Sequence, residues 1–348
     1  QRARALAGFA FGIPIGMAGG TLVGGLLAAT WGWRTAFVVV GLLGLVVAPL
    51  LLFTVREPRR ERQTVAEPLV TSEDAPGSDK VGRRAATVAV WLGALLLIGA
   101  GVAAAIGAAW TAPAFGGGLL LVIGLSLAVA KQAASVVIPK PSFWLLALGA
   151  ASSSVCGYGV AGWLPLFFMR SFDLTLAQTS WYYSGIALIG GLAGIWGGGV
   201  VADRLARKGK GAYPLTPAIA FLISAPCFVL AMNSHWLIGQ LLPGGGTQAQ
   251  ALVLAFLIFL IPTGLNLTWL GPLTAAVQSL VPAPMRSTAS ALFLLINNLL
   301  GLAVGFSYFG WMSDLLAPRF GEESLRWAIY SGMGFYVLAA ILLIGASR

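Results

Sequence analysis

The chain has 348 residues, of which 58% are hydrophobic and only 9% are charged, and its net charge is +10. A soluble domain carries roughly 25% charged residues, so this composition excludes a water-soluble fold. Several segments exceed about 18 apolar residues, the length that crosses a bilayer as a helix. The alternating segments of about 10 residues that build a membrane β-barrel are not seen in the sequence. The sequence therefore predicts an all-α polytopic membrane protein.

Ten apolar spans follow one another along the chain. Between the second and the third lies a charged segment, 56–86, which contains Pro and Ser and has no apolar period. Such a composition favours a solvated linker. The predicted spans are 5–29, 34–54, 87–109, 115–137, 142–168, 179–202, 213–233, 249–279, 287–312 and 325–346.

The positive charges lie unevenly between the two ends of these spans. If every span crosses and the chain starts in the cytoplasm, 17 of the 21 Lys and Arg residues are cytoplasmic. The four on the outer side are Arg34, Arg170, Arg319 and Arg326. An excess of positive charge marks the cytoplasmic side. The pattern predicts an integral protein of a bacterial inner (plasma) membrane, with the N-terminal end of this chain and the linker 56–86 in the cytoplasm. The +10 charge then reflects topology and contact with membrane lipids, and no nucleic-acid partner is expected.

A short motif follows the span 179–202. Gly199, Asp203, Arg204, Arg207 and Lys208 fit the pattern G-x-x-x-D-R-x-x-R-K. Together with the turn Trp-Gly-Trp-Arg at 31–34 and the run from Gly-Pro to Ser-Asp within 269–315, this motif resembles the major facilitator superfamily and, within it, the spinster-like branch. Ala206 stands where the family pattern usually has Gly.

The resemblance implies a partial major facilitator fold. It covers the chain outside 56–138 and corresponds to family helices five to twelve, so the first four helices have no counterpart here. The implied domains are 1–55, the last two helices of the N-terminal bundle, and 139–348, a six-helix C-terminal bundle. The segment 87–138 adds a hydrophobic hairpin that most members lack. We expect an N-terminally truncated fragment, whose partner would be the missing helices of the same protein.

Gating residues are implied by the same resemblance. In the family, the loop acid docks on the N-terminus of a helix in the opposite half and closes the cytoplasmic side. Asp203 would then contact Arg2, Arg4 or the first amides of helix five, and Gly199 would allow close approach. The alternative is a solvated charge at a helix end, paired with Arg207 one turn away. Arg286 is the equivalent base before helix eleven, and its expected acidic partner lies in the missing half.

Polar residues inside the spans are the candidates for a solute cavity, because such residues are costly in lipid and often functional. The family uses helices seven and ten to line its central cavity. Asn298 is better explained as a bond between helices, and the glycines of the first span are explained equally well by generic helix packing or by a role in rocking. The predicted cavity residues are Ser154, Tyr158, Asn266, Trp269, Asn297 and Asn298.

The sequence offers little support for an enzymatic or cofactor-dependent function. Asp, Glu, Lys, Arg and His do not occur in the middle of any span, and Cys156 and Cys227 read as buried thiols. There is one His and no nucleophile, metal or P-loop pattern, so neither an enzyme nor a cofactor is expected. We expect a secondary transporter of a small organic or amphipathic, lipid-like solute working by alternating access, with drug efflux or organic-anion uptake as variants. The alternative is a truncated, non-transporting membrane protein with a structural or partner-binding role.

Overall fold

The structure is a computed structural model. It describes residues 10–54, 131–205, 211–242 and 246–347, together with 87–88, 91–92, 95–96 and 121. All regular elements in this part of the chain are helices, which confirms the predicted all-α class. The predicted linker 56–86 and most of the predicted hairpin 87–138 lie outside the described residues.

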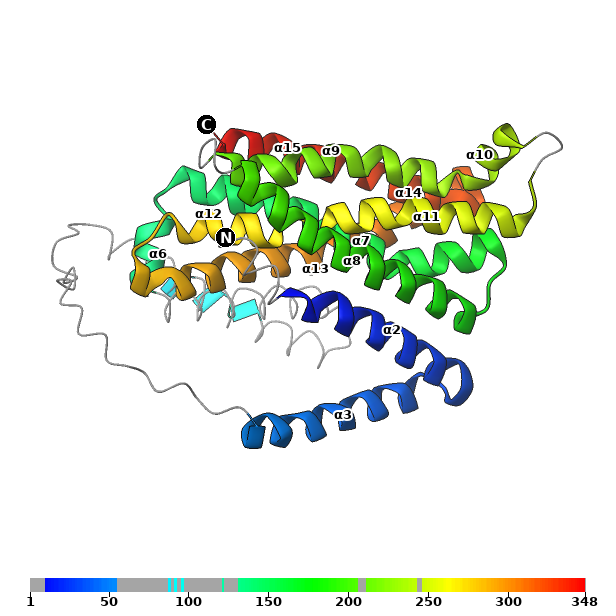
Figure 1. Cartoon of the computed structure of the whole chain (residues 1–348), viewed down its shortest axis with the longest axis horizontal. Helices are drawn as coiled ribbons and strands as arrows, with labels where there is room; N and C mark the ends of the chain where they lie inside the picture. Colours follow the sequence, from blue (N-terminus) through cyan, green and yellow to red (C-terminus); the bar gives the residue numbers. More distant parts are fainter. Residues whose placement is uncertain are drawn as a thin grey trace.

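The helices follow in chain order (Figure 1). They are α2 (Gly12–Trp31), α3 (Trp33–Thr54), α6 (Lys131–Val137), α7 (Pro141–Phe172), α8 (Leu176–Leu205), α9 (Ala212–Met232), α10 (Ser234–Leu241), α11 (Gln248–Asn266), α12 (Leu270–Gln278), α13 (Arg286–Phe320), α14 (Ser324–Gly332) and α15 (Gly334–Ala346). The 3₁₀ turns η2 (Ala283–Met285) and η3 (Gly321–Glu323) precede and follow α13.

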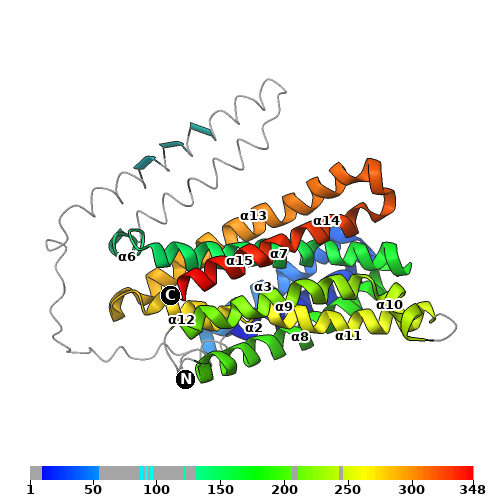
Figure 2. The same ribbon diagram turned by 90° about the horizontal axis from the view of Figure 1, so that it is seen from above.

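Six helical units in the described residues are long and apolar enough to cross a membrane. The last unit, Ala283–Ala346, runs along the bundle as α13, and the chain then turns and runs back as α14 and α15 (Figure 2). Together with α3, these helices account for eight of the ten predicted spans. Exposed side chains such as Phe37 (74% exposed) and Ile341 (61% exposed) are apolar. An apolar exterior of this kind fits a bilayer rather than water as the surrounding medium.

Two of the predicted spans are not single helices. The span 249–279 is divided between α11 and α12, and 325–346 is divided between α14 and α15 at Met333. Pro272 explains the first interruption, because a proline ring clashes with the carbonyl four residues earlier, here that of Thr268. The turn closes with short-range bonds, including Thr268 N–H to the Leu265 carbonyl at 3.2 Å.

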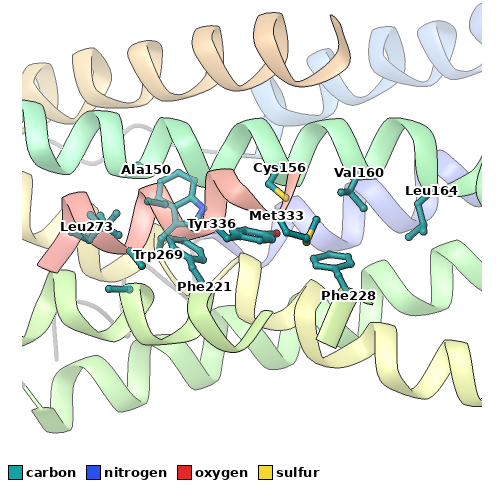
Figure 3. Packing of buried hydrophobic residues seen from close by; sticks show 14 of the residues in the cluster. Ala150, Cys156, Val160, Leu164, Phe221, Phe228, Trp269, Leu273, Met333 and Tyr336 are labelled. Carbon is teal, nitrogen blue, oxygen red and sulfur yellow. The ribbon is translucent and has the colours of Figure 1, made fainter. Parts of the chain in front are cut away.

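The core of the six-helix bundle is an aromatic and aliphatic cluster. Tyr336 of α15 stacks between Phe221 and Phe228 of α9, with centroid separations of 5.5 Å and 6.0 Å (Figure 3). Cys156 of α7 is fully buried beside them, as predicted. Cys227 was expected to be buried as well but is only partly covered, because it lies on a less enclosed side of α9. This cluster holds α7, α9 and α15 together.

The first two helices form a hairpin beside the bundle. Gly32 takes a φ of 83° between α2 and α3, and its N–H bonds to the Ala28 carbonyl at 3.1 Å. This left-handed backbone favours glycine, which explains the Trp-Gly-Trp-Arg turn noted in the sequence. In Figure 1, α2 lies between the bundle and α3, and it packs on α8.

Candidate functional site

The longest helix contact in the bundle joins α7 to α13 through glycines. A Cβ placed on Gly305 would lie 2.6 Å from the Val155 carbonyl oxygen and 3.0 Å from the backbone nitrogen of Gly159. A Cβ on Gly301 would lie 2.7 Å from the Cβ of Ser154. Glycines four residues apart let two helices approach at backbone distance in lipid. The two helices are therefore fixed close together near their middles.

Polar side chains cross this close contact. The Ser154 hydroxyl donates to Asn297 Oδ1 at 2.8 Å, and the Tyr158 hydroxyl donates to Asn298 Oδ1. Ser154 and Asn297 are buried, whereas Tyr158 and Asn298 are partly exposed. The Asn297 Nδ2 atom is buried without a hydrogen-bond partner in the described part of the chain. The structure thus brings four of the six predicted cavity residues into one polar group, with one amide donor left over.

A fifth predicted residue lies against another face of α7. Asn266, the last residue of α11, accepts a hydrogen bond from the Tyr336 hydroxyl at 3.0 Å. Its amide nitrogen lies against Gly157, where a Cβ would be only 2.6 Å away. Gly157 therefore makes room for Asn266, and it stands directly before Tyr158 in the chain. The two polar groups are neighbours through α7.

The interruption between α11 and α12 begins immediately after Asn266. Two glycines of α8 press against it: a Cβ on Gly194 would lie 1.8 Å from the Gly264 carbonyl oxygen, and one on Gly198 would lie 2.7 Å from the Thr268 Cα. Because these contacts are to backbone, neither glycine position has room for a side chain. The broken span is thus held on one side by α8 and on the other by α7 and α15.

Trp269 does not join these polar residues. It is 6% exposed and meets Phe293 of α13 edge to face, with ring centroids 6.0 Å apart. It lies in the apolar cluster with Phe221 and Tyr336 (Figure 3). The predicted span 249–279 would place Asn266 and Leu270 on a single helix. That placement is wrong, because the helix ends at Asn266 and a new one begins at Leu270.

Two residues of this region were missed in the sequence. Tyr336 and Gly157 carry no motif, and their roles depend on contacts with Asn266 across α15, α11 and α7. The signal that could have found the interruption was Pro272, although Pro262 in the same run lies inside α11 without ending it.

The predicted gating residues lie at the C-terminal end of α8, directly after Gly198. Gly199 is buried, Asp203 is partly buried and Arg204 is exposed near the end of that helix. Arg207, Lys208, Arg2 and Arg4 lie outside the described residues, and so does the predicted contact of Asp203 with the start of the chain. Arg286 begins α13, and its Nε atom is buried without a hydrogen-bond partner in the described residues.

Three contacts define how α2 lies along α8. Ala10 packs with Ile195, and a Cβ on Gly191 would lie 2.5 Å from Pro14. Further along, a Cβ on Gly25 would lie 1.9 Å from the Ser180 hydroxyl oxygen. From one pair to the next, each step forward along α2 is matched by an equal number of residues backward along α8. The two helices are therefore antiparallel and hold one register from Gly25 to Ala10, with the N-terminal end of α2 nearest the Asp203 end of α8.

Comparisons with known proteins agree with this architecture. The family model described as Major Facilitator Superfamily matches residues 1–306. An MFS-type efflux pump of Mycolicibacterium smegmatis is 27% identical over 99% of this chain and 62% of its own length. Protein spinster homolog 1 of Xenopus tropicalis is 26% identical over 99% of this chain and 57% of its own. The chain thus spans about three fifths of the relatives it matches.

A solved structure is also similar. It is a bacterial homologue of the human lysosomal transporter spinster, in an inward-facing and unoccupied conformation. The TM-score is 0.52 at 20% identity, over 78% of this chain and 69% of that one. At this identity the likeness concerns the fold.

Proposed function

Because the chain belongs to the Major Facilitator Superfamily, we propose that it forms part of a secondary active transporter that moves a small organic or amphipathic solute by alternating access. It is an integral membrane protein, and its similarity to spinster homologues supports the resemblance found in the sequence. We place it in a bacterial inner membrane, with the start of this chain and the linker 56–86 in the cytoplasm. The domains 1–55 and 139–348 would belong to opposite bundles of the intact transporter.

The observation that carries this proposal is the interrupted span α11–α12. Transporters commonly build their solute sites near the bilayer midplane from discontinuous helices, whose backbone and polar side chains are freed at the break. Here the break lies next to Asn266, and Asn266 contacts α7 and α15. The Tyr158–Asn298 bond lies one residue beyond Gly157 on α7. We propose that these groups face the solute when the two bundles are together.

The chemistry of these groups bears on the kind of solute. Tyr158, Asn266 and Asn298 offer hydroxyl and amide groups, and none of them carries a charge. Around them lie apolar and aromatic side chains of the core cluster. Neutral hydrogen-bonding groups within apolar walls suit an amphipathic or uncharged organic solute better than a strongly anionic one.

The register of α2 on α8 supports a cytoplasmic gate. Ala10, where the described chain begins, is level with Ile195, which precedes Asp203 by about two turns of α8. An acid at the C-terminal end of a helix is unfavourable by about 0.3–1 kcal/mol unless it finds a partner. We propose that Asp203 and the start of the chain close the cytoplasmic side together, and that Gly199 allows the approach.

This gate is testable by exchanging charges. In the intact transporter, Asp203→Arg should lower solute uptake strongly, and Arg2→Asp should lower it as well. Combining the two substitutions should restore a substantial part of the uptake if the two side chains meet. Arg319→Asp is the control, because Arg319 is exposed near the end of α13 and is not one of the predicted gating residues. A double variant no better than Asp203→Arg alone would rule out the pairing.

The transport function is testable in proteoliposomes. Full-length gene product would be reconstituted and offered lysophospholipids, cationic drugs and organic acids, alongside the Asp203→Asn variant. We expect uptake of one amphipathic class and a reduced rate in the variant. Failure of the intact protein to transport any of the three classes would contradict the proposal and favour a structural role.

A further inference from the structure

A small cavity of about 250 Å³ lies at the end of the bundle where α7 stops and α13 turns into α14. Its floor is apolar, because Phe167 and Leu325 are each only 2% exposed. The other lining residues are polar or charged: Arg170, Ser171, Glu322, Glu323 and Arg326. This end of α7 lies on the outer side in the predicted orientation. The solute region described above lies near the middle of α7, so this cavity is a separate feature.

The charges at the rim are only partly paired within the protein. Arg326 and Glu323 form an ion pair at 2.8 Å. Within the described residues, Arg170 and Glu322 have no ion-pair partner, although both line the same cavity. Both are exposed. The cavity therefore presents one cation and one anion that are free to bind a ligand carrying both signs of charge.

An aromatic group marks this part of the molecule as a membrane interface. Trp327, which follows Arg326, is 42% exposed and stacks on Phe320 with ring centroids 4.8 Å apart. The Arg319 guanidinium lies 5.4 Å from the centroid of Phe320. Exposed Trp beside Arg at a helix end is typical of the headgroup level of a bilayer. Lipid headgroups are therefore the polar groups present at high concentration around the cavity.

The volume of the cavity further restricts the kinds of ligand that it can hold. Sites for whole drug-sized ligands occupy about 300–1,000 Å³ and enclose most of the ligand. A cavity of about 250 Å³ suits a headgroup whose acyl chains remain in the bilayer. A carboxylate prefers an ammonium that can donate hydrogen bonds, and a guanidinium suits a phosphate.

We propose that this cavity binds the phosphate–ammonium headgroup of an outer-leaflet phosphatidylethanolamine, with the phosphate at Arg170 and the primary ammonium at Glu322. The apolar floor of Phe167 and Leu325 would contact the ethylene carbons of the headgroup. The bound lipid would join α7 to the α13–α14 turn. This inference concerns lipid binding at the rim and does not depend on which solute is transported.

Native mass spectrometry of the purified, delipidated chain would measure the binding of each lipid separately. The probes are dioleoyl forms of phosphatidylethanolamine, phosphatidylcholine and phosphatidylglycerol, together with free phosphoethanolamine. We expect phosphatidylethanolamine to bind tightest. Arg170→Gln should weaken it about fivefold or more, as expected when a charge-assisted bond is removed, and Arg170→Lys should retain most of the binding. Glu322→Gln should weaken phosphatidylethanolamine but leave phosphatidylglycerol unchanged.

Arg34→Gln serves as the matched control, because Arg34 is another predicted outer base and lies 4.4 Å from the centroid of Trp33. It should leave binding unchanged. An equal effect of Arg34→Gln and Arg170→Gln would show surface charge alone and overturn the proposal. If Glu322→Gln weakened phosphatidylethanolamine and phosphatidylglycerol equally, the proposed contact between Glu322 and the ammonium would be ruled out. Binding of free phosphoethanolamine as tightly as the lipid would reassign the cavity to a soluble zwitterion and overturn the lipid assignment.

Discussion

Glycines line both the α8–α11 contact and the α2 helix, but they do different things in the two places. At Gly194, a side chain would collide with the backbone of α11. In α2, a Cβ on Gly12, Gly16, Gly19, Gly20 or Gly24 would meet no atom within 4 Å in the described residues. Only Gly25 of this series comes against another helix, at Ser180. A run of glycines therefore marks a tight packing surface in one helix and an open face in the other.

The difference bears on which helices would move as one body in the proposed transporter. Within the six-helix bundle, α7 with α13 and α8 with α11 approach backbone to backbone, at glycines that have no room for a Cβ. The contact of α2 with α8 is made by a proline ring, an alanine and one glycine facing a serine side chain. In the proposed transporter these two helices belong to opposite bundles. A contact made through side chains rather than between two backbones is what rocking of one bundle against the other would require.

The largest effect is expected at Gly194. Gly194→Ala should lower the free energy of unfolding by about 1–3 kcal/mol, because the new methyl group would overpack against the Gly264 carbonyl. Gly197→Ala is the control, since Gly197 lies on the same helix and a Cβ there meets nothing within 4 Å. Titration with SDS in mixed micelles would measure both. An equal change of the unfolding free energy in the two variants would contradict a packing contact at Gly194.

The hydrogen bonds between α7 and α13 should also contribute to the free energy of unfolding. A double-mutant cycle of Ser154→Ala and Asn297→Ala should give a coupling of about 0.6 kcal/mol and at most about 1.7 kcal/mol, as found for hydrogen bonds between membrane helices. The same SDS titration supplies the four unfolding free energies. A coupling of zero would mean that the 2.8 Å bond adds nothing to the close contact made by the glycines.

A reversible loss, smaller than the one at Gly194, is expected at the contact of α2 with α8. Gly25→Ala should cost about 1 kcal/mol, because the new methyl group meets a hydroxyl and not backbone. Combining it with Ser180→Gly should return the helix contact, although the added glycine weakens α8 slightly. Cross-linking of cysteines placed at Pro14 and Gly191 would report the contact directly. Lack of recovery in the double variant would contradict the antiparallel register.

The smallest effect on stability belongs to the open face of α2. Gly20→Ala should change the free energy of unfolding by no more than about 0.5 kcal/mol, because nothing lies near the added methyl group. If α2 bends during transport, uptake by the intact protein should nevertheless fall in this variant. Unchanged uptake together with unchanged stability would leave these glycines as generic packing residues.

Hydropathy explains why the spans themselves could be predicted. Lipid selects for length and apolar content, and both are visible along the sequence. The interruption after Asn266 was missed, because a window of average hydropathy does not register a break between two apolar helices. The cause of that break, Pro272, was in the sequence, but its effect depends on a carbonyl four residues earlier.

The site was harder to predict than the fold, because its contacts join residues far apart in the chain. Ser154, Tyr158, Asn297 and Asn298 were chosen as polar residues in apolar spans, and the structure brings them together. Trp269 was chosen by the same reasoning but packs on Phe293 in the core. Tyr336 and Gly157 gave no signal, since a buried tyrosine or glycine is ordinary until its partner is known. Sequence position alone does not say which side of a helix a polar group will face.

The account depends most on Asn266 at the interrupted span, and solute uptake by the intact protein tests it most directly. Asn266→Ala would be compared with Ser331→Ala, because Asn266 and Ser331 each accept a bond from a tyrosine hydroxyl at 3.0 Å. We predict that Asn266→Ala loses uptake of the transported solute while its unfolding free energy falls no more than that of Ser331→Ala, which should keep its uptake. Full uptake by Asn266→Ala would contradict the proposed solute site.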